Sequence, residues 1–215
     1  MAERRRGVFI TFEGTDGCGK STQFRLLVER LRAEGRCVVA TVEPGGTAIG
    51  MQIRRILLDG RNQELRPTAE LLLYFAARAQ NVDELVEPAL ARGEIVVSDR
   101  WTDSTLVYQG AGRRLGPGVV ERLDEIACRG LKPDLTVCLE IDLETGLGRA
   151  HARNNAAGRT ETRMDEQALE FHQRVRDEYR ALAAREPERV KTVDARGSVE
   201  EVAARVWQVV EPHVR

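Results

Sequence analysis

Residues 14–21 read Gly14-Thr15-Asp16-Gly17-Cys18-Gly19-Lys20-Ser21, which is a complete G-x-x-x-x-G-K-[ST] phosphate-binding loop. A short apolar run precedes it at 8–12, and residues 22–31 have the pattern of a helix. A glycine-rich turn between a strand and a helix points backbone N–H groups and the positive end of the helix at one anion. We therefore expect the loop, from Gly14 to Thr22, to hold the phosphates of a nucleoside triphosphate, with Lys20 on the outer phosphates and Ser21 on Mg²⁺.

The competing interpretation of this motif is an ordinary glycine turn with an exposed lysine. The composition argues against it, because only three of the 33 basic residues are lysines and one of the three stands at the motif position. Cys18 occupies a variable position of the loop. We interpret it as a small filler residue rather than a nucleophile.

The overall composition indicates a globular protein. A chain of 215 residues, 42% of them hydrophobic, suits a single domain over 1–215, with room for an insertion. The net charge of −1 gives no general attraction to nucleic acid or to an anionic membrane, so neither is expected as a partner. The four cysteines are scattered without a C-x-x-C pair, and no secretory signal precedes them. They are expected to be reduced thiols in a cytoplasmic protein.

Strand-like and helix-like segments alternate along the chain. The predicted strands are 8–13, 37–42, 94–98, 134–140 and 190–194, and the predicted helices are 19–34, 47–58, 68–91, 117–129, 143–153, 166–185 and 198–210. This alternation predicts an α/β fold of the P-loop type: a parallel five-stranded sheet covered by helices on both faces. Residues 149–165 interrupt the rhythm with four arginines and an Asn-Asn-Ala-Ala-Gly run, and they predict a mobile, basic lid over a site.

Two further segments follow predicted strands, where ligands of open α/β sheets bind. Asp99 and Arg100 directly follow the strand predicted at 94–98. An acid at this point suits Mg²⁺, and an adjacent guanidinium suits a phosphate, although a surface ion pair is the alternative. The run Glu43-Pro44-Gly45-Gly46-Thr47 follows the second strand and indicates a special backbone close to a ligand, or else a plain turn.

Spacing on helices suggests two more groups. Tyr74 and Arg78 are four residues apart, so they share one helix face and could stack on and hydrogen-bond to a nucleobase. By spacing alone, a core tyrosine and a solvated arginine would be the better interpretation. Arg149 and Arg153 are also four apart and could reach one anion, whereas the alternative is a solvated basic face.

Taken in order, these motifs resemble the thymidylate kinase family from Phe9 to about Val206. The motifs that carry the resemblance are Phe12-Glu13-Gly14 with 16–22, Glu43-Pro44-Gly45-Gly46-Thr47, Arg78-Ala79-Gln80, Asp99-Arg100-Trp101, Ser104-Thr105 and Tyr108-Gln109-Gly110. The resemblance implies that the chain phosphorylates dTMP to dTDP with ATP and Mg²⁺ by direct in-line transfer. It also implies a homodimer.

The resemblance implies a role for each matching position. Asp16 would lie near the 3′-hydroxyl and phosphate of dTMP, Arg100 would bind that phosphate, and Asp99 would help to position the metal. Tyr74 would stack on thymine, Arg78 and Thr105 would face its edge, Tyr108 would crowd the 2′ position, and Gln109 would also line the pocket.

The resemblance further implies where the catalytic arginine comes from. Some family members carry it inside the phosphate loop, but that position is Gly17 here. The chain therefore resembles the group that supplies it from the lid, with Arg153 on the transferring phosphoryl group and Arg149 assisting.

Three positions depart from the family pattern. Val42 stands where an arginine is usual, so we expect one phosphate contact to be missing or to come from another residue such as Arg54. Trp101 replaces a smaller aromatic ring, and the lid is longer and ends differently, at Thr162-Arg163-Met164-Asp165.

Two other functions remain open at this point. One is another nucleoside monophosphate kinase, or a deoxynucleoside kinase, on the same scaffold. The other is an ATP-dependent switch or assembly protein, which should lack an acceptor pocket.

Overall fold

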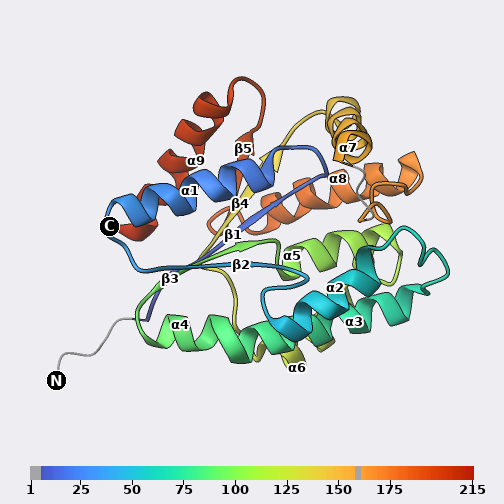
Figure 1. Cartoon of the computed structure of the whole chain (residues 1–215), viewed down its shortest axis with the longest axis horizontal. Coiled ribbons are helices and arrows are strands. Elements are labelled where there is room, and N and C mark those ends of the chain that lie inside the picture. The colour runs from blue at the N-terminus through green and yellow to red at the C-terminus, as the bar shows by residue number, and fades with distance from the viewer. Residues whose placement is uncertain (1–5, 158–160) are drawn as a thin grey trace.

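A single parallel sheet organises the chain. The computed structural model describes residues 6–157 and 161–215, with the backbone alone for 153–157. The strands are β1 (Phe9–Gly14), β2 (Val38–Val42), β3 (Ile95–Asp99), β4 (Leu135–Glu140) and β5 (Val190–Asp194), in the order β2-β3-β1-β4-β5 (Figure 1). Every pairing is parallel. The predicted five-stranded parallel sheet is confirmed, and the predicted bounds differ from the observed ones by at most one residue.

Helices connect the strands. They include α1 (Lys20–Ala33), α2 (Ala48–Leu58), α3 (Pro67–Asn81), α6 (Pro117–Cys128), α7 (Leu143–Ala157), α8 (Leu169–Arg185) and α9 (Val199–Val214). The single helix predicted over 68–91 is a continuous helical run of α3, a π-helical segment η1 (Val82–Val86) and α4 (Glu87–Ala91). In the part of the chain that the structure describes, no helix is long and apolar enough to cross a membrane.

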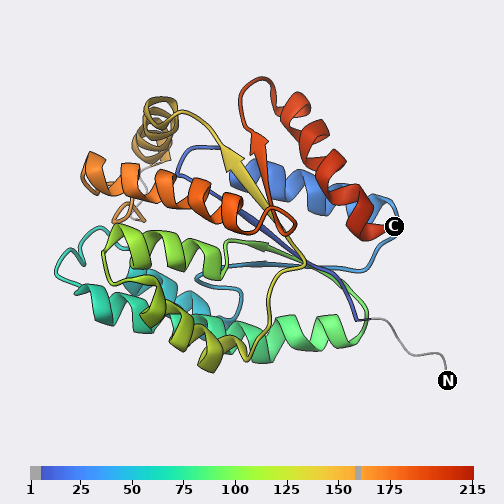
Figure 2. The ribbon, with the colours of Figure 1, turned by 180° about the vertical axis from the view of Figure 1, so that it is seen from behind.

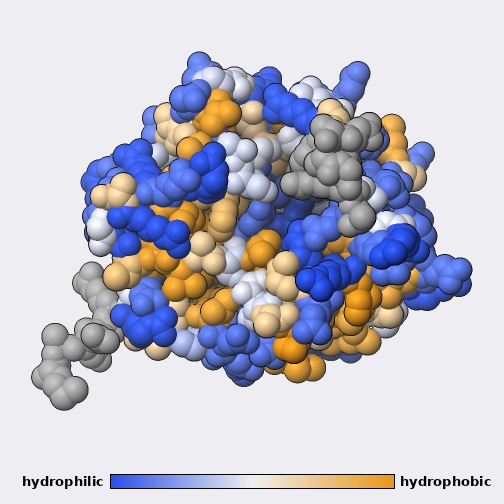
Figure 3. Space-filling view, in the orientation of Figure 1, coloured by the Kyte–Doolittle hydropathy of each residue, from blue (hydrophilic) through white to orange (hydrophobic). Residues whose placement is uncertain are grey.

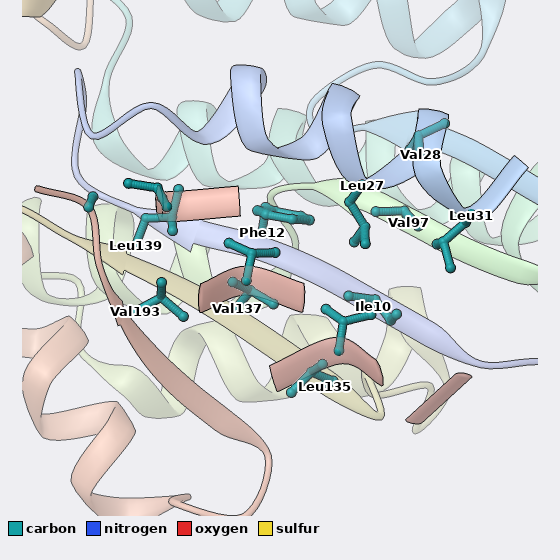
Figure 4. Packing of buried hydrophobic residues seen from close by; sticks show 14 of the residues in the cluster. Ile10, Phe12, Leu27, Val28, Leu31, Val97, Leu135, Val137, Leu139 and Val193 are labelled. Carbon is teal, nitrogen blue, oxygen red and sulfur yellow. The ribbon is translucent and has the colours of Figure 1, made fainter. Parts of the chain in front are cut away.

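The two faces of the sheet carry different helices. Alternate residues of β1 point to opposite faces, so Ile10 and Phe12 pack with α1 and α9 whereas Phe9 packs with the α3–α4 run and α6. Figure 4 shows the first of these layers, in which the sheet meets Leu27 and Leu31 of α1. Both faces of the sheet are thus buried under helices, as predicted.

Two segments differ from the sequence prediction. No helix was expected between β3 and residue 117, yet α5 (Thr102–Thr105) and η2 (Leu106–Gly112) form there, and η2 runs beside α8 (Figure 2). The segment has β-branched residues and glycines, which favour helix poorly, so packing against α8 outweighs propensity. The lid expected as a loop over 149–165 is helical as far as Ala157, because α7 extends into it. The predicted helix 143–153 is confirmed, and the loop expected beyond it was wrong for 154–157.

Candidate active site

A cavity of about 510 Å³ opens where the carboxyl ends of β2 and β3 meet the phosphate loop. The space-filling view shows a recess with hydrophilic residues on this face (Figure 3). The predicted site residues that line the cavity are Asp16, Gly17, Gly19, Lys20, Ser21, Thr22, Tyr74, Arg78, Asp99, Arg100, Thr105, Tyr108, Gln109 and Arg149. Segments far apart in sequence therefore share one space, as the carboxyl ends of parallel strands require.

The phosphate loop joins β1 to α1. Gly17 and Gly19 both have positive φ, at 73° and 92°, which a residue with a side chain adopts poorly. Lys20 is buried, and its Nζ donates to the carbonyl oxygens of Gly14 at 2.9 Å and Thr15 at 2.8 Å. The loop thus curls around its own lysine and holds the ammonium group at the wall of the cavity.

Three predicted loop residues do not line the cavity. Gly14 and Thr15 supply the carbonyl groups that hold Lys20 from behind. The Cys18 side chain is 2% exposed and packs into the core beneath the loop. A small apolar filler is the role that this packing supports.

Ser21 and Asp99 lie together at the junction of α1 and β3. The Ser21 hydroxyl donates to Oδ2 of Asp99 at 3.0 Å. A hydroxyl and a carboxylate are hard oxygen donors of the kind that Mg²⁺ takes alongside the phosphates of a nucleotide. The pair therefore fits the metal role predicted for these two residues.

An ion pair between Arg100 and Asp16 forms the floor of the cavity. Arg100 donates to Oδ1 of Asp16 at 2.8 Å, and the Tyr108 hydroxyl donates to Oδ2 at 2.9 Å. Burial alone would raise the pKa of Asp16, but the charges of Arg100 and Lys20 and the Tyr108 hydroxyl outweigh it and lower that pKa. Asp16 is therefore ionised at neutral pH, and Arg100 keeps a fixed orientation.

Arg100 sits in an unusual backbone conformation. Its φ is 73°, in the left-handed region. Its Nη1 also donates to the Ser104 hydroxyl at 2.8 Å, and the guanidinium stacks over the Tyr108 ring at 4.8 Å. Strained backbone held by such a set of contacts is typical of functional sites.

Glu13 holds this turn from below, a role that the sequence did not reveal. Its fully buried carboxylate accepts from the backbone N–H of Trp101 at 2.8 Å and from the hydroxyl groups of Ser104 at 2.5 Å and Tyr179 at 2.8 Å. Burial, with the nearby charge of Asp103, raises its pKa. The sequence signal for this role was the presence of an acidic residue, Glu13, near the end of a mostly apolar strand.

Tyr74, Arg78 and Thr105 meet at the other end of the cavity. Nη2 of Arg78 donates to the Thr105 hydroxyl at 2.9 Å, and its Nε lies 3.4 Å from Oε2 of Glu43. Nη1 of Arg78 is buried without a hydrogen-bond partner in the described structure. Because a buried donor without a partner is costly, this atom would gain from an acceptor on a bound ligand.

The surroundings of Arg78 are aromatic and tightly packed. Its guanidinium lies 4.9 Å from the Phe75 ring and 5.5 Å from the Trp101 ring, and Trp101 itself is fully buried against Phe9. Arg78 is therefore not the solvated arginine that spacing alone suggested. Trp101 fills the layer beneath the pocket.

Gln109 lines the same cavity from η2. Its side-chain amide nitrogen donates to Oε1 of the fully buried Glu70 at 2.7 Å. Burial and the charge of Glu70 raise the pKa of Tyr74 to about 12, so its phenol stays neutral. This end of the cavity thus offers a neutral ring and fixed polar groups, which suit a planar, uncharged ligand group.

The arginines of the predicted lid separate into three cases. Arg149 on α7 lines the cavity. Arg153 follows one turn later on the α7 backbone, and its side chain, like all of Arg159, lies outside the described residues. Arg163 is 1% exposed, donates from Nε to the Leu57 carbonyl at 2.5 Å and pairs with Glu70 at 2.7 Å. It therefore anchors the lid rather than facing the cavity.

Arg54 lies at the mouth of the cavity. Its guanidinium pairs with Glu161 at 2.8 Å and donates to the Pro44 carbonyl at 2.9 Å. A cationic group is thus present beside the turn after β2, close to where Val42 replaces the usual arginine.

Comparisons with known proteins point to one family. The family model described as thymidylate kinase matches residues 12–206. A thymidylate kinase of Geobacter sp. (strain M21) is 52% identical over 205 residues, which are 95% of this chain and 91% of that protein. One of Synechococcus sp. (strain JA-2-3B'a(2-13)) is 50% identical and covers 96% of both chains. The crystal structure of thymidylate kinase from Ehrlichia chaffeensis superposes with a TM-score of 0.76 at 31% identity, covering 96% of this chain and 99% of that one.

Proposed function

The chain belongs to the thymidylate kinase family, and from this premise we propose that the cavity is where it transfers the γ-phosphoryl group of ATP to dTMP. One observation carries the assignment to this cavity. A phosphate loop and a pocket for a planar base open into the same space, and the Arg100–Asp16 pair also lines it. Such an arrangement brings two nucleotides end to end, as in-line transfer requires.

The acceptor nucleotide would occupy the end of the cavity with Tyr74 and Arg78. The buried Nη1 of Arg78 supplies a donor for a carbonyl on the base edge, and Thr105 lies beside it. Tyr74 offers its ring for stacking, and Tyr108 would crowd a 2′-hydroxyl. A pocket built on fixed hydrogen bonds rejects a wrong base because its own buried groups would lose their partners.

The acceptor phosphate would bind Arg100. Its guanidinium is held by Asp16, Ser104 and Tyr108, so it need not reorganise when an anion arrives. Asp16 is the ionised group nearest to this arginine and would accept from the 3′-hydroxyl of dTMP. No strong general base is needed, because a phosphate oxygen is already a charged nucleophile at neutral pH.

The donor nucleotide would lie on the phosphate loop. Residues Gly14 to Thr22 would surround the β- and γ-phosphates, and Lys20 would exchange its carbonyl partners for phosphate oxygens. Ser21 and Asp99 would hold Mg²⁺. When bound, this ion neutralises charge on the transferring group.

The lid would complete the site. Residues 1–215 would act as one kinase unit, with about 149–165 closing over the phosphates. Arg149 already faces the cavity, and Arg153 lies one helical turn later, so both could reach the same anion. We assign Arg153 to the transferring phosphoryl group and Arg149 to its support.

We infer a cytoplasmic homodimer. Four free cysteines, three of them buried, suit a reducing compartment. Large apolar side chains are exposed on adjacent helices of one side, namely Ile49 and Ile56 on α2, Leu72 on α3 and Ile126 on α6. Figure 3 shows hydrophobic residues over α2 and α3. Such a patch is characteristic of an interface between subunits.

An ADP-release assay with dTMP, dUMP, CMP, AMP and thymidine as acceptors tests this function. We expect the highest kcat/KM with dTMP. A preference for CMP or AMP would indicate another nucleoside monophosphate kinase, and a preference for thymidine a deoxynucleoside kinase. Slow turnover that no acceptor accelerates would instead indicate an ATP-dependent switch protein.

A further inference from the structure

Glu70 on α3 is the centre of a buried cluster outside the phosphate-binding machinery. Its side chain is fully buried, accepts hydrogen bonds from two other side chains and forms an ion pair with a third. Oε1 accepts from Nε2 of Gln109 at 2.7 Å and from Nε of Arg113 at 3.2 Å. Oε2 accepts from Arg113 at 3.1 Å and forms an ion pair with Arg163 at 2.7 Å. The positive charges of two guanidinium groups therefore offset the negative charge of one buried carboxylate.

The contact between Glu70 and Gln109 fixes which end of an amide faces the cavity. A carboxylate paired with two guanidinium groups has no proton to give, so it can only accept. Gln109 must therefore turn its NH₂ group toward Glu70. Its carbonyl oxygen Oε1 then remains for the cavity that Gln109 lines, and no described side chain donates to that oxygen.

We propose that Glu70 is a positioning residue for base selectivity, which holds the Gln109 amide so that an acceptor faces the base beside the donors of Arg78. This inference rests on the proposed function, in which that end of the cavity binds the base of dTMP. Arg78 and Gln109 both line this cavity, so they then present a donor and an acceptor to the same ligand.

The donor–acceptor order distinguishes two pyrimidines. The edge of thymine offers the O4 acceptor and the N3–H donor, whereas the edge of cytosine offers an amino donor and the N3 acceptor. A reversed Gln109 amide would present NH₂ to N3, which leaves thymine with a donor facing a donor. Because the amide ends of glutamine have almost the same shape, only its partner decides between them.

The test is the ratio of kcat/KM for dTMP to kcat/KM for dCMP in the full chain with saturating ATP and Mg²⁺. Glu70→Gln keeps the shape but allows either end of the Gln109 amide to find a partner. We expect the ratio to fall by at least about tenfold, since one buried hydrogen bond to dTMP is lost. A smaller change would overturn the proposal. If this variant does not fold, Glu70→Asp, whose shorter carboxylate cannot reach Gln109, is judged by the same criterion.

Two further variants separate positioning from general loosening. The first is the double variant Glu70→Gln with Gln109→Glu, which exchanges the two side chains. Its amide at position 70 donates to the carboxylate at position 109. That carboxylate then presents an acceptor oxygen to the base, as Gln109 does in the wild type. This double variant should regain most of the wild-type ratio. Arg163→Lys weakens the same cluster at Oε2 without touching Gln109, so it should destabilise the protein and leave the ratio within about twofold.

The outcomes distinguish this inference from the proposed function. If Arg163→Lys shifts the ratio as much as Glu70→Gln does, the cluster acts through rigidity alone and the positioning role is refuted. A wild-type chain without dTMP kinase activity would refute the proposed function. A wild type active on dTMP, with an unchanged ratio in Glu70→Gln, would refute only the positioning role.

Discussion

Gly17 of the phosphate loop lies directly against Gly146 of α7. A Cβ atom on Gly17 would lie 1.9 Å from the Gly146 carbonyl oxygen, and a Cβ atom on Gly146 would lie 2.8 Å from the Asp16 carbonyl oxygen. The first turn of α7 thus occupies the space that a side chain at position 17 would need. Arg149 follows three residues later on the same helix and lines the cavity. The phosphate loop has no room for an arginine here, and the helix that fills the space carries one instead.

Gly17→Ala is expected to destabilise the protein by about 1–3 kcal/mol and to lower kcat. The φ of 73° disfavours any Cβ, and the clash with Gly146 would push α7 away from the loop. Urea unfolding and steady-state kinetics measure both effects. Gly148→Ala is the matched control, because a Cβ there, two residues along α7, meets no atom within 4 Å. Its stability should stay the same or rise slightly, and equal stabilities of the two variants would contradict the packing argument.

Arg153→Ala is expected to lower kcat by about 10³-fold while leaving the KM for dTMP within a few-fold. An arginine that meets the transferring phosphoryl group acts mainly in the transition state. Arg149→Ala should have a smaller effect. His151→Ala, which removes an exposed side chain from the same helix, is the control. Near-normal kcat in Arg153→Ala would remove Arg153 from the mechanism.

Asp99→Asn is expected to raise the Mg²⁺ concentration for half-maximal activity by at least about tenfold, because a neutral amide replaces the carboxylate beside Ser21. The measurement is a Mg²⁺ titration of the rate at constant MgATP. Glu140→Gln removes an acid from the end of another strand, β4, and should leave the titration unchanged. An unchanged midpoint in Asp99→Asn would show that the metal is held elsewhere.

Glu43 should make stability depend on pH. Burial raises the pKa of this carboxyl to about 7 from 4.5, although Arg78 and Asn81 favour its ionised form. Since the folded protein binds this proton more tightly than the unfolded chain, its contribution is complete below about pH 4.5 and is lost as pH rises to 7.

The matching variant is Glu43→Gln. Relative to it, the wild-type free energy of unfolding should fall by up to about 3 kcal/mol between these limits. Urea unfolding of both proteins at several pH values from 5 to 8 measures the difference. Parallel pH profiles would show that the pKa of Glu43 is not raised.

Leu72→Glu with Ile126→Glu is expected to convert a homodimer into monomers. Both apolar side chains are exposed, at 51% and 73%, on neighbouring helices, and a charge inside an interface is strongly unfavourable. Sedimentation velocity measures the mass. Val199→Glu on α9, across the sheet, should leave the mass unchanged. A wild type that sediments as a monomer would refute the dimer itself.

Sequence patterns predicted the sheet better than the helices around the site. Each strand is a short apolar run, and burial on both faces of a parallel sheet demands that composition. The α5–η2 segment gave no helical pattern, because it is stabilised by Glu13 at its start and by α8 along its side. The helix predicted over 143–153 ended four residues too early, because the Asn-Asn-Ala-Ala-Gly run suggested a loop, whereas α7 continues to Ala157.

The site residues also divide into those that the sequence predicted and those that it did not. Lys20, Tyr74, Arg78 and Arg100 were predicted and share one cavity. The residues that hold them in place were not predicted. Tyr179 contacts Glu13 across 166 positions, and Glu70 joins Gln109 to Arg163. No local pattern marks such contacts, because the partners meet only after the chain has folded.

By itself, the sequence determined the sheet, the phosphate loop and the chemical types of the residues around it. These follow from local causes: apolar periodicity, glycine in a tight turn, and motif spacing along one strand or helix. Only the tertiary structure decided which ends of those residues face the ligand. The ionised state of Asp16 and the direction of the Gln109 amide are each set by neighbours distant in sequence, Arg100 and Glu70. Burial fixes these protonation states and orientations, because a polar group removed from water can bond only to the partners that the fold places beside it.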